Sequence, residues 1–127
     1  MVGIVVASHS RRLAEGVVEL AQMMAPNVPI AAAGGLEDDS TGTSCKKILG
    51  AMMQVYSDDG VAILMDLGSA VMTAEIAMEL FNRPKLKLVD CPLVEGAVVA
   101  AIEANQGASL EEIEQRASEA GTIKKLM

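Results

Sequence analysis

The sequence predicts a single α/β domain with a doubly wound, open parallel sheet of about four strands in the order 2-1-3-4 and helices on both faces. Short apolar runs rich in β-branched residues alternate with longer stretches of helical periodicity, and short connections join them. The chain has 127 residues, of which 51% are hydrophobic and 21% charged, so it is long and apolar enough to bury one core.

The first half of the chain is expected to hold two strand–helix units. Residues 2–7 are continuously apolar, which is typical of a parallel strand buried on both faces. Residues 11–24 follow with apolar side chains every three or four positions, and a proline ends this helix. Residues 28–33 are the second expected strand, which a pair of glycines breaks. A second helix begins near Thr43.

The second half repeats this pattern. An Asp-Gly turn leads into a third buried strand at residues 61–65, and a Gly-Ser pair opens a helix that runs to Phe81. A proline stops this helix before the fourth strand at residues 86–89. Residues 93–104 have a helical pattern, and the Ser-x-x-Glu sequence that starts at Ser109 is a capping box for a last helix.

Helical spacing also predicts which side chains face the sheet. With one Tyr, one Phe and no Trp, the core must be aliphatic, and the nine methionines are interpreted mainly as flexible filling of that core. For residues 121–127 the sequence leaves helix, edge strand and frayed tail open. The expected inward side chains are Leu13, Val17, Leu20 and Met24 in the first helix, Ile48, Met52 and Val55 in the second, and Val71, Met72, Ile76 and Leu80 in the third.

Charge and composition exclude several classes of partner. The net charge of −7 opposes binding to nucleic acid and to anionic membrane surfaces, and two aromatic residues cannot form a platform for stacking bases. The first residues lack the basic stretch of a signal peptide, and each longer weakly charged stretch is interrupted before it could span a bilayer. Cys45 and Cys91 have no metal-type spacing and are expected to be reduced, buried thiols in a cytoplasmic protein.

The sequence lacks the local signatures of nucleotide and metal sites. Neither G-x-x-x-x-G-K-S/T nor G-x-G-x-x-G occurs. The acidic pairs at 38–39 and 58–59 have no histidine or cysteine at ligand spacing, so they are interpreted as loop and turn residues. We therefore expect neither a bound metal nor a cofactor.

The single histidine is the strongest candidate for chemistry. Open parallel sheets bind ligands at the carboxyl ends of their strands, where the strand order reverses. His9 follows the first strand and Asp66 follows the third, so we expect them side by side at this point. A neutral imidazole can attack phosphorus through one nitrogen while a carboxylate holds the proton of the other. The position alone leaves open the alternative of an ordinary surface histidine near a helix start.

Glycines and hydroxyl groups at the same edge are candidates for binding phosphate. A helix start presents free backbone N–H groups and the positive end of the helix dipole, which suit phosphate oxygens. Either Arg11 or Arg12 would add positive charge. The candidate phosphate-binding residues are Gly35 after the second strand, Thr43 and Ser44 at one helix start, and Gly68 and Ser69 at another.

A receiver-type signalling domain is the competing interpretation, because it has a similar layout and a phosphoacceptor aspartate where Asp66 stands. A receiver also needs an acidic pair after the first strand to bind Mg²⁺. Ser8 and His9 occupy those positions, so the metal site of a receiver is missing.

The residues around these positions resemble the mannose-family EIIA domains of the bacterial phosphoenolpyruvate-dependent sugar phosphotransferase system, and most closely the branch that serves dihydroxyacetone kinase. The matching blocks run in order over nearly the whole chain, and it is their combination that is specific. They are VVASHS at 5–10, LAEG at 13–16, AAGG at 32–35, GTS at 42–44, LMDLGSA at 64–70 and PLVEGA at 92–97.

The resemblance implies that residues 1–127 are a single mannose-type EIIA phosphocarrier domain. Phospho-HPr would phosphorylate His9 on Nε2, with Asp66 as the partner of the ring. The acceptor would be ADP held by the kinase subunit DhaL, which passes phosphate to dihydroxyacetone bound covalently on DhaK. The family is typically homodimeric.

Two alternatives to this function remain. Sugar-transport members usually carry a Gly-Gly-Ser-Pro-like turn after the aspartate, whereas this chain has Gly-Ser-Ala at 68–70, which favours the dihydroxyacetone branch. An EIIA domain that feeds a mannose-type sugar permease is nevertheless one alternative, because the catalytic residues do not reveal the downstream partner. A non-catalytic regulatory domain on the same scaffold is the other.

Overall fold

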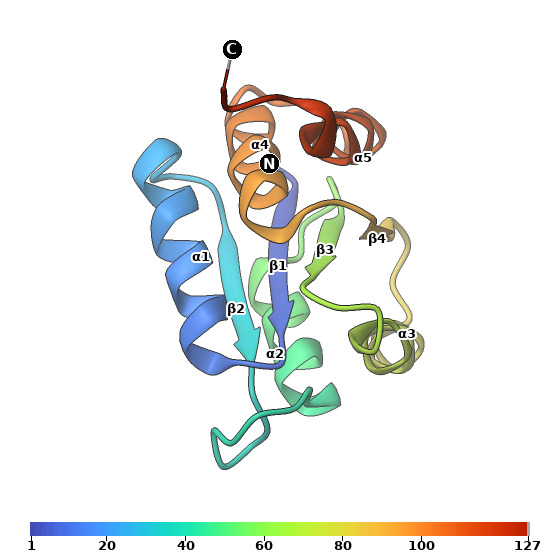
Figure 1. The fold of residues 1–127 in the computed structure, drawn as a ribbon. Coiled ribbons are helices and arrows are strands. Elements are labelled where there is room, and N and C mark those ends of the chain that lie inside the picture. The colour runs from blue at the N-terminus through green and yellow to red at the C-terminus, as the bar shows by residue number, and fades with distance from the viewer. Residues whose placement is uncertain (127) are drawn as a thin grey trace.

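Four parallel strands form one sheet in the order β2-β1-β3-β4, as predicted (Figure 1). The computed structural model describes residues 1–126. The strands are β1 (Gly3–Ser8), β2 (Ile30–Gly34), β3 (Val61–Met65) and β4 (Leu86–Val89). All six residues of β1 are buried, which explains why its sequence is apolar up to the final Ser8.

Helices cover both faces of this sheet, so the prediction of a doubly wound domain is confirmed. One face carries α1 (Arg11–Met24), α4 (Leu93–Asn105) and α5 (Leu110–Glu119), and the other carries α2 (Cys45–Val55) and α3 (Ala70–Phe81). Within residues 1–126, none of the helices has both the length and the apolar character needed to cross a membrane.

The helix starts follow the capping residues of the sequence. The side chain of Ser109 accepts a hydrogen bond from the N–H of Glu112, whose carboxylate accepts one from the N–H of Ser109, so the predicted capping box is confirmed. A short 3-10 helix (Ala120–Thr122) follows α5. Of the three alternatives for residues 121–127, the structure shows a helical turn at residues 121–122. Position 127 lies outside the described residues.

The predicted inward faces of the first and third helices are wrong in part. Val17 is buried, but the side chains of Leu13, Leu20 and Met24 are 42%, 38% and 50% exposed. In α3 the sheet-facing side chains are alanines, whereas Met72, Ile76 and Leu80 are 74%, 51% and 65% exposed. Several methionines, therefore, lie on the surface rather than filling the core. The predicted inward face of α2 is confirmed, because Ile48, Met52 and Val55 are buried.

Small residues explain this rotation of the helices, because alanines on the inner face allow a helix backbone to approach the sheet closely. One such close approach is at Gly34, the last residue of β2. A Cβ atom there would lie 2.5 Å from the carbonyl oxygen of Ser10 and 2.8 Å from Cα of Arg11. Only glycine therefore lets α1 begin this close to the sheet, directly after His9.

Candidate active site

His9 and Asp66 lie side by side at the carboxyl edge of the sheet, as the strand order predicts. His9 follows β1, and Asp66 is the first residue after β3. The register pairs Ala7 with Met65, and the N–H of Asp66 donates to the carbonyl oxygen of Ala7 at 3.2 Å. The sheet itself therefore brings the two candidate residues together.

The carboxylate of Asp66 holds both the ring and the backbone of His9. Oδ1 accepts from Nδ1 of the ring at 3.0 Å and from the N–H of Leu67 at 2.7 Å. Oδ2 accepts from the backbone N–H of His9 at 3.0 Å and from the hydroxyl of Ser8 at 2.9 Å. With four donors around it, the carboxylate has little freedom to turn.

These contacts keep Asp66 ionised. Burial raises the pKa of this carboxyl, but the hydrogen bonds from the backbone and ring of His9, the hydroxyl of Ser8 and the N–H of Leu67 together hold its pKa below the ordinary value. An ionised carboxylate can only accept hydrogen bonds. The proton between Asp66 and His9 therefore belongs to Nδ1 of the ring.

A neutral ring that carries its proton on Nδ1 has a free electron pair on Nε2. The hydroxyl of Ser69 lies 2.8 Å from Nε2, and for this tautomer it is the hydroxyl that donates. The side chain of His9 is 28% exposed, whereas that of Asp66 is 11% exposed. The Nδ1 edge of the ring thus faces the more buried carboxylate, and Nε2 lies on the opposite edge of the ring.

The hydroxyl that contacts this nitrogen belongs to a residue at the start of α3. Ser69 is the N-cap residue of α3, but its side chain makes no capping bond and contacts His9 instead. Among residues 1–126, no hydrogen bond occupies the backbone N–H groups of Gly68 and Ser69. These donors and the helix dipole would favour an anion on Nε2.

The other three candidate phosphate-binding residues have partners of their own. The hydroxyl of Thr43 lies 2.9 Å from that of Thr73, and the hydroxyl of Ser44 caps α2 by accepting from an N–H. Gly35 donates its N–H to the carbonyl oxygen of Ser8 at 3.1 Å. Direct contact of these residues with phosphate stays a prediction.

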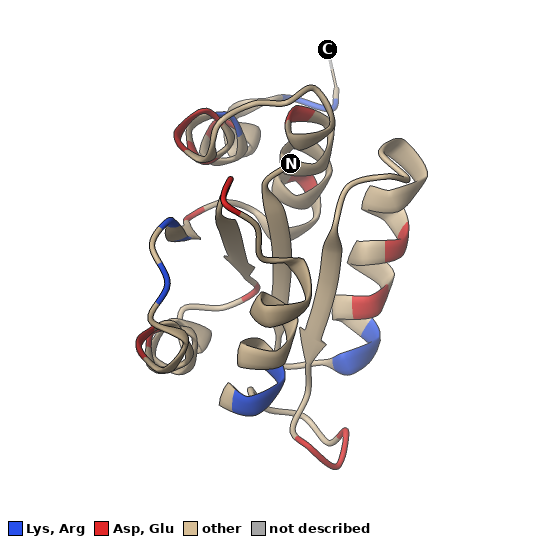
Figure 2. Ribbon diagram, turned by 180° about the vertical axis from the view of Figure 1, so that it is seen from behind, with Lys and Arg blue, Asp and Glu red and all other residues tan. Residues whose placement is uncertain are grey.

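Basic residues surround the same edge, but acidic partners neutralise some of them. Figure 2 shows basic stretches at the starts of α1 and α2 and an acidic stretch in the loop between β2 and α2. Asp39 in this loop pairs with Lys47 at 2.7 Å and with Arg11 at 3.6 Å. Lys47 also donates to the carbonyl oxygen of Gly34 at 2.9 Å. Local spacing in the sequence does not predict these contacts of Lys47, because its partners lie 13 and 8 positions away along the chain.

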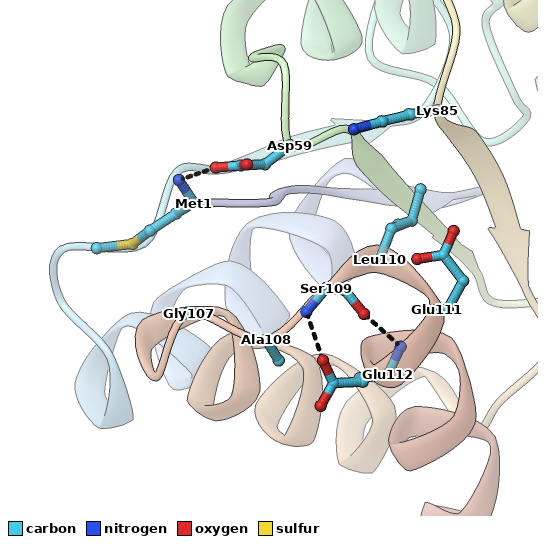
Figure 3. Close-up of a pocket in the computed structure, with 9 residues that line it drawn as sticks. All are labelled: Met1, Asp59, Lys85, Gly107, Ala108, Ser109, Leu110, Glu111 and Glu112. Atoms are coloured by element: carbon cyan, nitrogen blue, oxygen red, sulfur yellow. Dashed lines mark hydrogen bonds and ion pairs between the residues drawn. The ribbon is translucent and has the colours of Figure 1, made fainter.

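Cavities elsewhere in the described residues lack comparable chemistry. A cavity of about 320 Å³ lies at the amino ends of the strands, where the N-terminal amine pairs with Asp59 at 2.7 Å and Ser109 and Glu112 bond one another (Figure 3). Cys45 and Cys91 are free thiols, and burial together with nearby Asp90 raises the pKa of Cys91 to about 11. Residues 1–126 hold no group of three metal-binding side chains.

The fold and site together define a class of protein: a doubly wound α/β domain whose single histidine is oriented by an aspartate at the switch point of the sheet. The sequence profile of the EIIA-man family, described as "PTS system fructose IIA component", matches residues 3–114. The chain belongs to this family.

Curated relatives narrow the comparison. The chain is 40% identical over 120 residues to "PEP-dependent dihydroxyacetone kinase, phosphoryl donor subunit DhaM" of Escherichia coli (strain K12). The matched region covers 89% of this chain but only 25% of that protein. The chain thus spans about a quarter of the length of this relative. It is also 35% identical to "PEP-dependent dihydroxyacetone kinase 2, phosphoryl donor subunit DhaM" of Listeria innocua, covering 91% of this chain and 95% of that one.

Solved structures agree with the fold. A crystal structure described as that of a protein of unknown function superposes with a TM-score of 0.84 at 32% identity, covering 100% of this chain and 99% of the other. A crystal structure of a sigma-54 interaction domain protein from Enterococcus faecalis superposes with a TM-score of 0.72 at 20% identity, covering 95% of this chain and 90% of the other. The second likeness concerns the fold alone.

Proposed function

We propose that this chain is a phosphocarrier domain that accepts a phosphoryl group from phospho-HPr on Nε2 of His9 and passes it to ADP on the DhaL subunit of dihydroxyacetone kinase. One observation carries the proposal: the ionised carboxylate of Asp66 holds the ring proton on Nδ1, so Nε2 keeps an electron pair that contacts only the hydroxyl of Ser69. The relatives from Escherichia coli and Listeria innocua are phosphoryl donor subunits of this kinase, which supports the choice of acceptor.

The chemical step follows from the tautomer. The electron pair of Nε2 attacks the phosphorus of the donor phosphohistidine, so a new N–P bond forms while the old N–P bond breaks and its electron pair returns to the donor ring. The ring of His9 becomes cationic and keeps its Nδ1 proton, and the charge of Asp66 stabilises it. In the second transfer an oxygen of the terminal phosphate of ADP attacks the phosphorus on Nε2. The N–P bond breaks and its electron pair returns to Nε2, so the ring of His9 becomes neutral again.

The start of α3 supplies the binding of the phosphoryl oxygens. When phosphate occupies Nε2, the hydroxyl of Ser69 can no longer donate to that nitrogen and turns to a phosphoryl oxygen. The free N–H groups of Gly68 and Ser69 donate to the same group. Contacts of Gly35, Thr43 and Ser44 with the phosphoryl group also belong to the proposal, and the hydroxyl of Ser44 keeps a proton to donate because it only accepts from the N–H of Lys47.

Two assays in sequence test the proposed function. Incubation of the chain with phosphoenolpyruvate, enzyme I and HPr is expected to label it with acid-labile phosphate. Addition of DhaL and DhaK with ADP and dihydroxyacetone is then expected to discharge the label and yield phosphorylated dihydroxyacetone. Labelling without discharge would favour the EIIA domain of a sugar permease, and a complete lack of labelling would favour a non-catalytic regulatory domain.

A cytoplasmic location belongs to the proposal, because a soluble donor and soluble kinase subunits must reach His9.

A homodimer is also part of the proposal. The outer face of α3 carries an uncovered apolar stripe of Met72, Ile76 and Leu80, which are four residues apart and therefore lie on one side of the helix. Next to it, β4 is an edge strand that pairs only with β3. A second copy that covers the stripe and the open edge would bury both.

A charge on the stripe is expected to separate the dimer. Ile76→Asp would place an unpaired carboxylate in the apolar contact, which costs several kcal/mol in a buried interface. Light scattering is expected to give twice the mass of one chain for the wild type and the mass of one chain for Ile76→Asp. Met23→Asp, at a methionine of α1 that is similarly exposed, is the matched control and is expected to stay dimeric. A dimeric Ile76→Asp would exclude this face.

A further inference from the structure

Ser8 is an unusual residue, because it is polar and completely buried at the end of an otherwise apolar strand. Only Ser8 and Ser44 are buried polar residues within positions 1–126, and Ser44 caps a helix. Ser8 ends β1, where its Cα pairs with Gly34 of β2. A buried hydroxyl that caps no helix and lies one residue before His9 calls for a different explanation.

The hydroxyl of Ser8 has both of its roles fixed by neighbours. It accepts a hydrogen bond from the backbone N–H of Ser10 at 3.0 Å, and it donates to Oδ2 of Asp66 at 2.9 Å. Because the N–H of Ser10 approaches its electron pair, its own proton is directed at Asp66. The side chain of Ser10 is used separately, as the N-cap of α1. One buried hydroxyl therefore connects the end of β1, the start of α1 and the aspartate after β3.

We propose that Ser8 is a positioning residue for phosphoryl transfer: its hydroxyl fixes the plane of the Asp66 carboxylate so that Oδ1 faces Nδ1 of His9. This inference rests on the proposed function, since it assigns Ser8 to the same site. Ser8 does not contact Nε2, where the phosphoryl group is carried. It acts through Asp66 and so has no direct part in the chemistry.

The contacts of the carboxylate explain why this hydroxyl matters. The terminal torsion of an aspartate is soft, with two broad and roughly equivalent orientations. Oδ1 is held by Nδ1 of His9 and the N–H of Leu67, and Oδ2 is held only by the N–H of His9 and by Ser8. Three of these four donors belong to His9, which carries the ring, or to Leu67, which follows Asp66 in the chain. Ser8 supplies the one donor that is anchored in the buried strand.

The hydroxyl of Ser8 also helps to keep the carboxylate ionised, because it is among the donors that lower the pKa of Asp66. The side chains of the other charged or titratable groups around this edge make no hydrogen bond with the hydroxyl of Ser8, which contacts only Asp66 and the N–H of Ser10. Arg11 and Lys47 pair with Asp39 on the side of α1 and α2. Asp90 and Cys91 line a small pocket with Asp66 on the side of β4 and α4. A shift caused by a Ser8 variant can therefore be assigned to the lost hydrogen bond.

Ser8→Ala is the deciding variant, and alanine fits the site because it is smaller. The rate constant of phosphorylation at saturating phospho-HPr is expected to fall about tenfold, with little change in KM. A tenfold loss is the low end of what is lost in metal sites when a hydrogen-bond partner of a ligand is removed. Carbon-13 NMR of the carboxyl is expected to show a higher titration midpoint for Asp66. Nitrogen-15 NMR of the ring is expected to show a smaller fraction of His9 with its proton on Nδ1.

Two further variants separate positioning from general stability. Ser109→Ala removes a helix cap at the opposite end of the sheet, so it is expected to lower the melting temperature but leave the rate and the Asp66 titration unchanged. Ser8→Thr keeps the hydroxyl and is expected to restore the wild-type titration. If Ser8→Thr does not fold, the titration of Ser8→Ala still decides.

The NMR measurements do not depend on phosphoryl transfer. An unchanged Asp66 titration and an unchanged ring tautomer in Ser8→Ala would overturn the positioning role, whatever the transfer rate. A wild-type chain that takes no phosphate would instead overturn the proposed function. The two failures are therefore distinguishable.

Discussion

Replacing His9 with alanine is expected to abolish the acid-labile phosphate that the chain receives from phospho-HPr. His9 is the only histidine of the chain, and under the proposed function its Nε2 is the nucleophile. Loss of a covalent nucleophile lowers turnover by about 10⁶-fold in enzymes that have been dissected in this way. We expect the label on His9→Ala to fall to background in an assay that follows phosphate from phosphoenolpyruvate.

Other nucleophiles in the described residues are not expected to replace His9. The thiol of Cys91 lies near Asp66, but its pKa of about 11 leaves it almost entirely protonated at neutral pH, so it is a poor nucleophile. Cys91→Ala is therefore the matched control, and it is expected to be labelled like the wild type. Acid-labile phosphate on His9→Ala would contradict the assignment of His9, and loss of label from Cys91→Ala would place the thiol in the reaction.

The sequence predicts the neighbourhood of His9 and Asp66 because that neighbourhood depends on the sheet alone. Buried parallel strands are continuously apolar, so β1 and β3 can be recognised directly. Once the strand order is 2-1-3-4, the residues after these two strands must lie side by side. The helix boundaries are predictable for a similar reason, since serines and prolines mark them locally.

The helix faces and the supporting contacts could not be predicted in the same way. The periodicity of Met72, Ile76 and Leu80 marks one side of α3, but the alanines three or four residues apart mark another. Which side faces the sheet depends on how closely the backbone can approach, and this is a property of the packed structure. The bond between Ser8 and Asp66 joins residues 58 positions apart, so local spacing carries no sign of it.

Replacing Asp66 with asparagine is expected to slow phosphorylation of His9 by about 10²- to 10⁴-fold, the range that a positioned acid–base partner contributes. Asparagine keeps the size of the side chain but removes its charge, so the cationic ring formed on phosphorylation loses its counter-ion. An amide can also donate to Nδ1, which would move the ring proton to Nε2 and block the nucleophile. Single-turnover labelling at several concentrations of phospho-HPr measures this loss.

The same variant tests the ionisation of Asp66 through its pH dependence. Because the pKa of Asp66 is lower in the folded chain than in the unfolded chain, the unfolded chain binds more protons as the solution is acidified. The stabilisation from this carboxylate is therefore complete above the unfolded pKa of about 3.9, and it is lost as the pH falls through the folded value. Asp66→Asn lacks this part of the acid dependence.

Together, rate and stability distinguish two ways in which Asp66 could matter. If it orients the ring and compensates its charge, Asp66→Asn stays folded at neutral pH but transfers slowly, and its free energy of unfolding falls less steeply than that of the wild type below pH 4. If Asp66 only holds the end of β3 in place, the variant loses stability at all pH values and transfer falls in proportion to the unfolded fraction. A folded Asp66→Asn that transfers at the wild-type rate would remove Asp66 from the mechanism, and with it the reason for a buried hydroxyl at Ser8.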